Sequence, residues 1–268
     1  MGRPYKTEAV ILRSIRYAEA DRILHLYTAD RGRIGAIAKG VRKTTSRFGG
    51  RLEPLGHVEL MLHQGSGELQ TITGVSLVRS HHETREDGFR LGVGLIGAEA
   101  MLRLFTEQEG NERAFTALTR FLDLLDDTPP GGRADLDPLG LSFQLKLLWL
   151  SGYLPHVGSC AECGADGPLA GYSARAGGTV CRACSAGALA LSPDGLGGMD
   201  ALLRSPLADA RAVGLTERGA RDVLAVITAS YEEHGGFRLR TLGLGASAAK
   251  PPAPGPKTGA PSAPLGAG

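Results

Sequence analysis

Several signals that would place this chain in a common class are missing from its sequence. No segment approaches the roughly 18 uninterrupted apolar residues that a membrane-spanning helix needs, and the amino-terminal residues MGRPYKTEAV contain no apolar signal core. We therefore expect a cytoplasmic protein without a membrane partner. The chain also has no P-loop, no HExxH motif and no nucleophile elbow, so the sequence gives no sign of an enzyme.

Aromatic residues are scarce, at 5% of the chain with a single tryptophan. Within residues 1–80 they are Tyr5, Tyr17, Tyr27 and Phe48. Proteins that bind single strands without sequence preference usually stack the bases on several aromatic rings. We expect any nucleic-acid contact here to run through the sugar-phosphate backbone instead, with Tyr17 or Phe48 as a minor stacking contributor at most.

The charges are unevenly distributed, although the formal net charge is only +2. Residues 1–80 carry 13 Lys and Arg against 7 Asp and Glu, whereas residues 81–150 carry 7 against 12. A polyanion should therefore meet the first part of the chain, and the acidic middle should serve packing or protein partners.

The stretch 31–51 concentrates this positive charge and contains no acidic residue. Its cations repel one another, and a bound polyanion would remove the repulsion and release its own counterions. We expect a mobile, extended loop that binds DNA, the alternative being a solvated surface loop, which is what most basic runs are. The predicted DNA-binding residues are Arg31, Arg33, Lys39, Arg42, Lys43, Arg47 and Arg51.

Residues 1–80 are expected to form a small β-barrel. Apolar and polar residues alternate in 23–28 and 34–39, and turn residues cluster at 30–32 and 64–67. Five short strands without a long helix between them suit a closed sheet, because the edges of an open sheet would need protection. An OB-type barrel is predicted, with a sandwich half or an SH3-like barrel as alternatives that the sequence does not separate. In an OB barrel the loop after the third strand lies near the binding face, where the basic stretch would sit.

Two further parts of the chain, 81–155 and 191–244, are predicted to form an α-helical domain in two pieces. Apolar residues recur at spacings of three and four over 89–104 and 115–125, which predicts two amphipathic helices. The segment LSFQLKLLWLSGYL is apolar nearly all round, as in a central helix buried by its neighbours. Trp149, the single tryptophan, is expected in that core.

The sequence Gly92-Val-Gly94-Leu-Ile-Gly97 matches the dinucleotide-binding fingerprint in form only. A pyrophosphate site needs its glycines in a tight turn between a strand and a helix, whereas these fall within helical periodicity. Close approach of two helices is the better interpretation, since glycine has no side chain to separate them.

The remaining segments carry local signals for helix starts and for disorder. Ser192-Pro193-Asp194 and Thr216 are each predicted to begin a helix. Residues 245–268 consist mainly of Pro, Ala and Gly without periodicity, so we expect a disordered tail.

The four cysteines form the sharpest motif in the chain, C-x2-C, 17 residues, C-x2-C, within a predicted module of residues 156–190. Each pair spans a knuckle short enough for two sulfurs to reach one ion, and the intervening loop can join the pairs into a tetrahedral site. We predict one structural zinc ion, with a rubredoxin-like iron site as the competitor. Four thiolates leave no open coordination position, so the ion should fold its loop and not catalyse a reaction. The predicted ligands are Cys160, Cys163, Cys181 and Cys184.

Three motifs in order resemble the N-terminal signature of the RecO family of bacterial recombination mediators. They are Tyr17-Ala-Glu19-Ala-Asp21, Tyr27-Thr28-Ala-Asp30-Arg31-Gly32 and Ala38-Lys39-Gly40-Val41-Arg42-Lys43. The resemblance implies an N-terminal OB domain, a helical middle domain and, in some members, a Cys-rich zinc module. It also implies binding of single- and double-stranded DNA, strand annealing, and RecR, single-strand binding protein and, indirectly, RecA as partners. Glu19 and Asp21 have a second interpretation, as turn-forming residues that hydrogen-bond at the end of the first hairpin.

Together these features predict an α+β multidomain protein that acts as a non-enzymatic mediator in DNA repair and recombination. It would bind both kinds of DNA through the backbone, anneal complementary strands and, with RecR, help to load RecA on DNA covered by single-strand binding protein. The alternatives are a zinc-ribbon subunit of a nucleic-acid-processing enzyme and a scaffold whose basic loop meets acidic protein. Annealing without nucleotide or divalent metal separates the first hypothesis from the other two.

Overall fold

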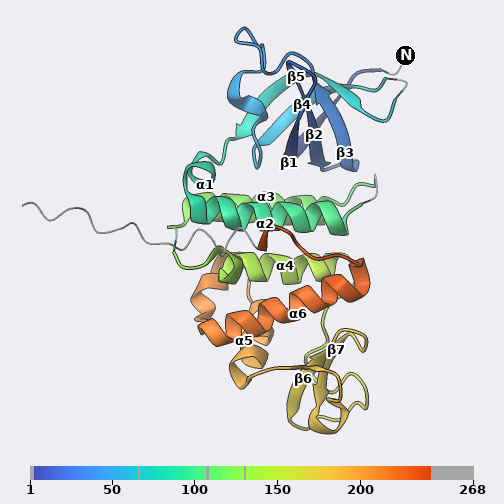
Figure 1. Cartoon of the computed structure of the whole chain (residues 1–268), viewed down its shortest axis with the longest axis vertical. Helices are drawn as coiled ribbons and strands as arrows, with labels where there is room; N and C mark the ends of the chain where they lie inside the picture. The colour runs from blue at the N-terminus through green and yellow to red at the C-terminus, as the bar shows by residue number, and fades with distance from the viewer. Residues whose placement is uncertain (1–2, 66, 107–108, 130, 243–268) are drawn as a thin grey trace, which may run out of the picture.

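The computed structural model describes residues 3–65, 67–106, 109–129 and 131–242. The molecule is elongated, with a β-barrel at one end, layers of helices in the middle and the cysteine module at the other end (Figure 1). The predicted disordered tail lies outside the described residues. No helix among the described residues is both long and apolar enough to cross a membrane.

Five strands close into the barrel in the order β1-β2-β3-β5-β4. β1 pairs with β4 in antiparallel register, and the only parallel pairing in the described barrel joins β3 to β5 through Ala36 with Gln70 and Ile37 with Thr71. This order confirms the OB-type barrel over the sandwich half and the SH3-like barrel. The strands are β1 (Tyr5–Tyr17), β2 (Asp21–Thr28), β3 (Gly32–Ala38), β4 (His57–His63) and β5 (Gln70–Arg79).

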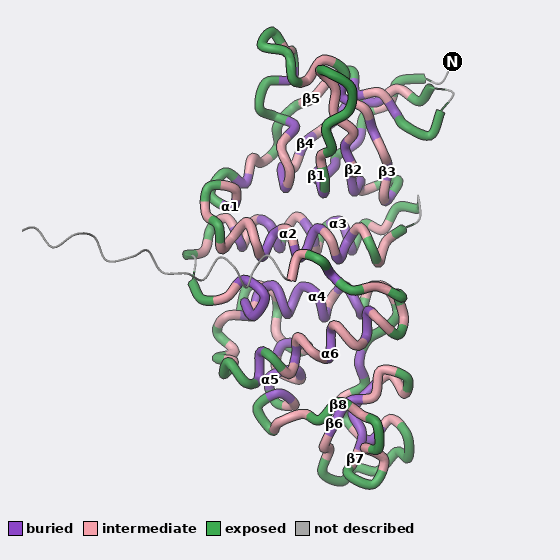
Figure 2. Tube along the Cα trace, in the orientation of Figure 1, coloured by how far each residue is buried: buried purple, intermediate pink, exposed green. Residues whose placement is uncertain are grey.

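The alternation of side chains along β1 and β2 serves two cores at once. Residues such as Ile11 and Leu26 point into the barrel, whereas Val10, Leu12 and Tyr27 point outward and join the core of the helices. A register shift between Ile11 and Arg13 places Leu12 as an extra residue in β1, which re-aims the strand at this contact. Figure 2 shows the buried residues continuing from the strands into the helices.

Six α-helices occupy the described part of the chain beyond the barrel. The five long ones each begin at a polar residue whose side chain accepts a hydrogen bond from a backbone N–H of the first turn. The helix starts predicted at Ser192 and Thr216 are confirmed. The helices are α1 (His82–Glu86), α2 (Gly88–Leu104), α3 (Glu112–Asp127), α4 (Pro138–Leu150), α5 (Pro193–Arg204) and α6 (Glu217–Gly235), with short 3-10 turns η2 (Ala134–Leu136) and η4 (Leu207–Val213).

Helix α2 lies beside α3 in the layer between the barrel and α4 (Figure 1). The glycines of the apparent dinucleotide fingerprint fall inside it: a Cβ at Gly94 would lie 2.6 Å from Leu55, and one at Gly97 would lie 2.6 Å from Phe121. They serve close packing, as predicted, and not a phosphate turn. The amphipathic pattern is confirmed for α3 but wrong for α2, because α2 is covered on two sides and buries residues on both.

Helix α4 is the central helix that the sequence predicts, with nearly every residue from Leu139 to Leu148 buried. The placement of Trp149 in this core is wrong, since its side chain is 52% exposed. Position 149 falls near the end of α4, and its indole lies on the surface between α3, η4 and α5.

The cysteine module leaves the helices after α4 and returns at α5. It consists of β6 (Leu169–Ser173), β7 (Gly178–Cys181), β8 (Leu189–Ala190) and the 3-10 turn η3 (Arg182–Cys184), with the sheet order β7-β6-β8. Tyr172 of β6 is buried against the helices, and its hydroxyl lies 2.7 Å from the hydroxyl of Ser230 on α6. This contact fixes the module to the helical core.

The close packing at Gly97 gives a test of the helical core. Gly97→Ala places a methyl group against Phe121 and Phe143, whose rings stack 4.1 Å apart, so we expect a loss of about 1–3 kcal/mol in the free energy of unfolding. Gly88→Ala, on the same helix with no atom within 4 Å of the new Cβ, is the control and should be neutral or slightly stabilising. Urea unfolding measures both, and equal stability of the two variants would contradict the packing.

Candidate nucleic-acid interface and metal centre

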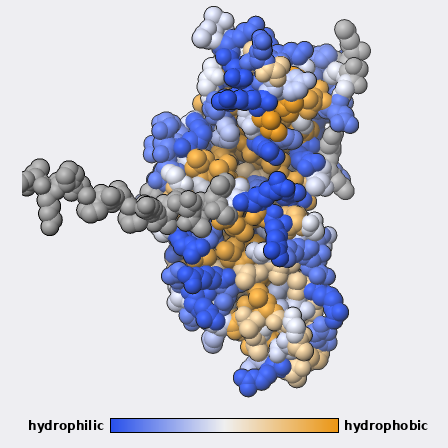
Figure 3. Space-filling view, viewed as in Figure 1, coloured by the Kyte–Doolittle hydropathy of each residue, from blue (hydrophilic) through white to orange (hydrophobic). Residues whose placement is uncertain are grey.

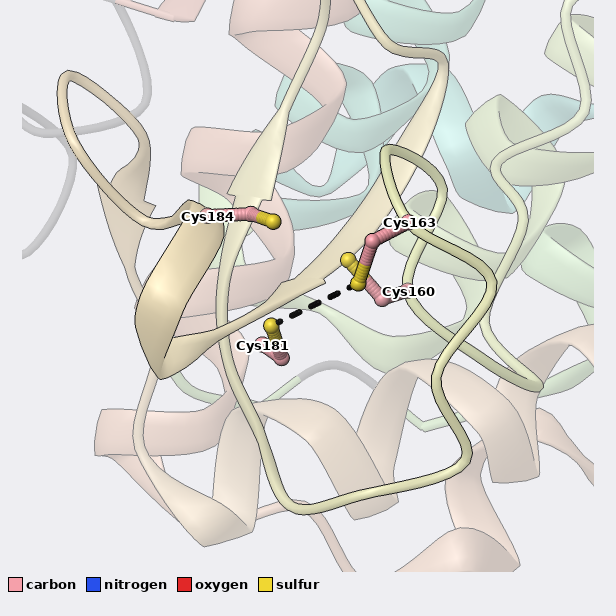
Figure 4. Close-up of side chains that lie close together, drawn as sticks. All are labelled: Cys160, Cys163, Cys181 and Cys184. Carbon is pink, nitrogen blue, oxygen red and sulfur yellow. Dashed lines mark hydrogen bonds between the residues drawn. The ribbon is translucent and has the colours of Figure 1, made fainter.

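The four cysteines converge at one point of the module (Figure 4). Their sulfur atoms all lie within 4.8 Å of one another, and those of Cys163 and Cys181 are 3.9 Å apart. One pair comes from the loop before β6 and the other from the end of β7 and η3, so the loop between them brings the pairs together as predicted. A cluster of this kind can bind a metal ion.

The first knuckle is shaped by its own backbone. The amide of Gly164 donates to the carbonyl of Cys160 at 2.8 Å, and Gly164 adopts a φ of +74°, which favours glycine. The amide of Cys160 in turn donates to Ala165. Gly164 therefore closes the tight turn of the first knuckle.

The environment of the thiols favours binding of a cation. Backbone N–H groups of Cys181, Cys163 and Glu162 point at Cys160 and lower the pKa of its thiol to about 6. The neighbouring thiols of Cys163 and Cys181 act oppositely on Cys184 and raise its pKa to about 12. The four sulfurs cannot all carry negative charge at neutral pH unless a cation compensates them, so metal binding would release protons from the cluster.

The predicted DNA-binding residues separate into two groups. Arg31 lies in the β2–β3 turn, with its guanidinium 3.9 Å above the ring of Tyr5 and 3.4 Å from Asp30. Arg33 lies on β3 and donates to the carbonyl of Leu102 on α2 at 3.1 Å. These two arginines are at the start of β3, whereas the other five predicted residues follow its end.

The five remaining cations lie on the loop between β3 and β4, here called the basic loop (residues 39–55). This loop is less extended than predicted, because Phe48 and Leu52 are buried in the barrel core and the 3-10 turn η1 (Gly49–Leu52) lies between them. Arg51 donates to the carbonyls of Phe48, Val75 and Arg47, so it holds the loop in shape.

All five cations of the basic loop are exposed, and four of them are not used to hold its backbone in shape. The guanidinium of Arg42 donates to the carbonyl of Glu19 at 2.9 Å, and that of Arg47 lies 4.9 Å above the ring of Phe48. Within the described residues, no carboxylate lies within 4.0 Å of Lys39, Arg42, Lys43 or Arg47. Their positive charge is therefore available to a ligand. In Figure 3, hydrophilic side chains lie around an apolar patch at the barrel end, and others lie over the helices and the module.

The tip of the β1–β2 hairpin supports the basic loop. Asp21 accepts a hydrogen bond from the amide of Gly40 at 2.7 Å, and the carbonyl of Ala20 accepts one from the amide of Arg42 at 2.9 Å. Of Glu19 and Asp21, the interpretation as a residue that hydrogen-bonds at the end of the first hairpin is confirmed for Asp21.

Of the two rings named as minor stacking contributors, Tyr17 is 51% exposed at this hairpin, whereas Phe48 is 1% exposed and cannot stack on a base.

A groove that sequence reasoning missed lies on the helices. It has a volume of about 660 Å³ and is lined by Trp149 and Leu150 of α4, Leu207 of η4, and Arg113 and Arg120 of α3. No local signal in the sequence indicates this groove, because the single tryptophan is expected in the core and is in fact exposed. Only the fold brings α3, α4 and η4 together around it.

Comparison with known families matches almost the whole chain. A family model described as Recombination protein O N terminal matches residues 1–81, and one described as Recombination protein O C terminal matches residues 85–243. The first covers the barrel, and the second covers the helices together with the cysteine module.

Curated relatives named DNA repair protein RecO are similar over most of their lengths. The protein of Rubrobacter xylanophilus is 40% identical over 234 residues, which are 84% of this chain and 91% of the relative. That of Anaeromyxobacter sp. (strain K) is 34% identical over 87% of this chain and 92% of its own, and that of Thermobifida fusca is 34% identical over 90% and 97%. With both family models and these relatives in agreement, the chain belongs to the RecO family of DNA repair proteins.

Proposed function

We propose that this protein is a DNA-binding recombination mediator that holds single- and double-stranded DNA by the sugar-phosphate backbone. The observation that carries the proposal is the set of exposed cations on the basic loop, Lys39, Arg42, Lys43 and Arg47, which have no carboxylate partner among the described residues. Cations in this state attract phosphates from any sequence and release the counterions of the DNA. Tyr17 adds one stacking surface beside them.

The mediator anneals complementary strands, because neutralising the phosphates of two strands removes the repulsion between them. The proposed activity requires no catalysis by the protein. Its action with other proteins is inferred from the family resemblance. With RecR it helps to load RecA on DNA covered by single-strand binding protein.

The cysteine cluster holds one structural zinc ion. A tetrahedral site with zinc–sulfur distances of about 2.3 Å has sulfur–sulfur edges of about 3.8 Å, and the 3.9 Å between Cys163 and Cys181 fits that edge. With four thiolates the coordination is closed, so the ion would brace the module and not activate water. Iron in a rubredoxin-like site is the competing assignment.

The groove beside Trp149 docks an acidic peptide with apolar side chains, supplied by single-strand binding protein. Among the described residues that line the groove, the cations Arg113, Arg120 and Lys146 outnumber the one carboxylate, Glu112. Trp149, Leu150 and Leu207 form an apolar floor beside them. This combination complements a segment that carries both carboxylates and apolar groups. A docking site on the helices leaves the basic loop free for DNA.

The alternative functions make different predictions about annealing. A zinc-ribbon subunit of a nucleic-acid-processing enzyme, or a scaffold for acidic proteins, has no reason to anneal oligonucleotides without nucleotide or divalent metal. Gel-shift and annealing assays on the purified chain therefore separate the proposal from both alternatives. A chain that binds neither form of DNA at low salt would exclude the proposal.

Charge reversal on the basic loop should abolish DNA binding without unfolding the barrel. We expect Lys39→Glu/Arg42→Glu/Lys43→Glu to lose annealing. In the wild type, neutralisation of about four to five phosphates predicts a slope of roughly −3 to −5 in log K against log salt. The matched control, Arg175→Glu/Arg218→Glu/Arg221→Glu, makes the same change in net charge away from the loop and should keep annealing. An equal loss of annealing in both variants would mean that net charge, and not the basic loop, determines the activity.

Removal of the metal should loosen the cysteine module. We expect about one zinc ion per chain by elemental analysis, and faster proteolysis within residues 155–190 after chelation, because the ion links the two knuckles. Cys184→Ser should reproduce the effect, whereas the neighbouring Ser185→Ala should not. Acid should also release the ion, since protons compete for the thiolates. Unchanged proteolysis after metal loss would contradict a bracing role.

Truncation of the groove tryptophan should weaken the contact with single-strand binding protein. We expect Trp149→Ala to lower the affinity by about tenfold or more in calorimetric titrations, as for a central aromatic of an interface. Tyr153→Ala is the control, because Tyr153 is also exposed but stacks on His234 outside the groove. Equal affinity of both variants would exclude this groove as the docking site.

A further inference from the structure

A second cationic site lies where the barrel meets the helices. Four arginines from four separate segments line a cleft of about 510 Å³ there. Glu99 of α2 is the only carboxylate among the described residues that line it. The arginines are Arg13 of β1, Arg33 of β3, Arg103 of α2 and Arg240, which follows α6.

The single carboxylate does not neutralise these charges. Glu99 accepts hydrogen bonds from the amide and the hydroxyl of Thr241 at 2.9 and 2.8 Å, and its nearest cation, Arg103, is 4.0 Å away. Counting the four guanidinium groups against this carboxylate leaves a formal charge of +3 on the lining. Holding like charges in a cleft costs free energy that a bound anion removes.

The arginines differ in how they are held. Arg33 donates to the carbonyl of Leu102, and the guanidinium of Arg103 lies 5.8 Å from the ring of Phe237. Arg13 and Arg240 are exposed and have no hydrogen-bond or ion-pair partner among the described residues. The cleft therefore has two arginines tied to the fold and two free to close on a ligand.

The pKa of His25 on β2 responds to the positive charge of the cleft. Burial lowers the pKa of its imidazole, and Arg13 and Arg33 lower it further. The imidazole also lines the same cleft as Glu99, Arg103 and Arg240. An anion bound among these groups would stabilise the protonated ring, so its pKa would rise.

We propose that this cleft binds a phosphate group of a nucleic-acid strand, as a second backbone site separate from the basic loop. The inference rests on the proposed function and extends it. Guanidinium groups present paired N–H donors that match phosphate oxygens. Leu12, Leu95 and Leu102 provide an apolar wall for the sugar of the same nucleotide.

The cleft and the basic loop are far enough apart to act independently. Arg33 lies near the start of β3 and Lys39 directly after its end, six residues further along the chain, which corresponds to about 20 Å of extended strand. Changes at sites separated by more than about 10 Å usually have additive effects on free energy. Two such sites would let the protein hold two strands, or two points of one strand, at once.

The test uses the two arginines that are not tied to the fold. We expect Arg13→Ala/Arg240→Ala to weaken binding of an oligonucleotide by about tenfold or more and to reduce the magnitude of the salt slope by about 1–2. The matched control, Arg175→Ala/Arg238→Ala, removes two exposed arginines outside both sites and should leave affinity and slope unchanged. Circular dichroism verifies that both double variants keep the wild-type melting temperature.

The outcomes separate this inference from the proposed function. If the wild type binds DNA and the loop variant does not, but the cleft variant matches the wild type in affinity and slope, the cleft is not a DNA site. If the wild type binds no DNA at all, the proposed function fails and the cleft inference with it. Additive losses in a variant that combines the loop and cleft changes would support two sites.

Nuclear magnetic resonance of His25 distinguishes a strand from a small phosphorylated molecule. Inorganic phosphate, a mononucleotide and an oligonucleotide are each titrated, and we expect the oligonucleotide to raise the pKa of His25 in the wild type and not in the cleft variant. If the mononucleotide raises it while oligonucleotide affinity is the same in both proteins, the cleft serves a free nucleotide and the strand proposal is overturned.

Discussion

The close contact between Leu55 and Gly94 fixes how the barrel is joined to the rest of the molecule. Leu55 ends the basic loop, is fully buried, and belongs to the core of the helices and not to that of the barrel. Its carbonyl lies 2.7 Å from Nδ1 of His81, whose other ring nitrogen lies 3.0 Å from Asp123 on α3. A side chain at position 94 would occupy the space that Leu55 fills. Because the loop that leads into β4 buries Leu55 among the helices, beside Val10, Leu12 and Tyr27 of the strands, the barrel is held in one orientation on the helices.

That orientation decides where positive charge collects. Arg13 and Arg33 of the barrel reach the cleft only because β1 and β3 lie against α2, which contributes Arg103. At the other end of β3 the basic loop is anchored by Phe48 and Leu52, so its cations stay on the surface. Burial of a few apolar side chains thus sets the positions of two separate groups of arginine and lysine. Neither group is balanced by carboxylates among the described residues.

The sequence predicts the elements of this fold better than it predicts their contacts. Alternation along 23–28, the capping residues Ser192 and Thr216, and the spacing of the cysteines are local patterns, and each element appears as expected. Burial on two sides of α2 was missed, because its apolar residues also fit an amphipathic helix. Exposure of Trp149 depends on which helices end nearby, and that information is not local.

The candidate sites show the same limit. The concentration of cations within residues 39–51 is visible in the sequence. The burial of Phe48 and the three contacts of Arg51 with backbone carbonyls are not. The cleft combines Arg13 with Arg240, which are separated by most of the chain, so no spacing rule could have found it. Long-range pairs of this kind follow from topology alone.

The exposed indole on α4 has a practical consequence. As the chain contains one tryptophan, its tryptophan emission comes from a single place, at the rim of a groove and not on the barrel. A ligand seated in that groove would exclude water from the ring and shift the emission to shorter wavelengths, whereas a ligand on the barrel would leave the ring in water. The protein therefore carries its own optical label, which would distinguish a ligand in the groove from one on the barrel without any added dye.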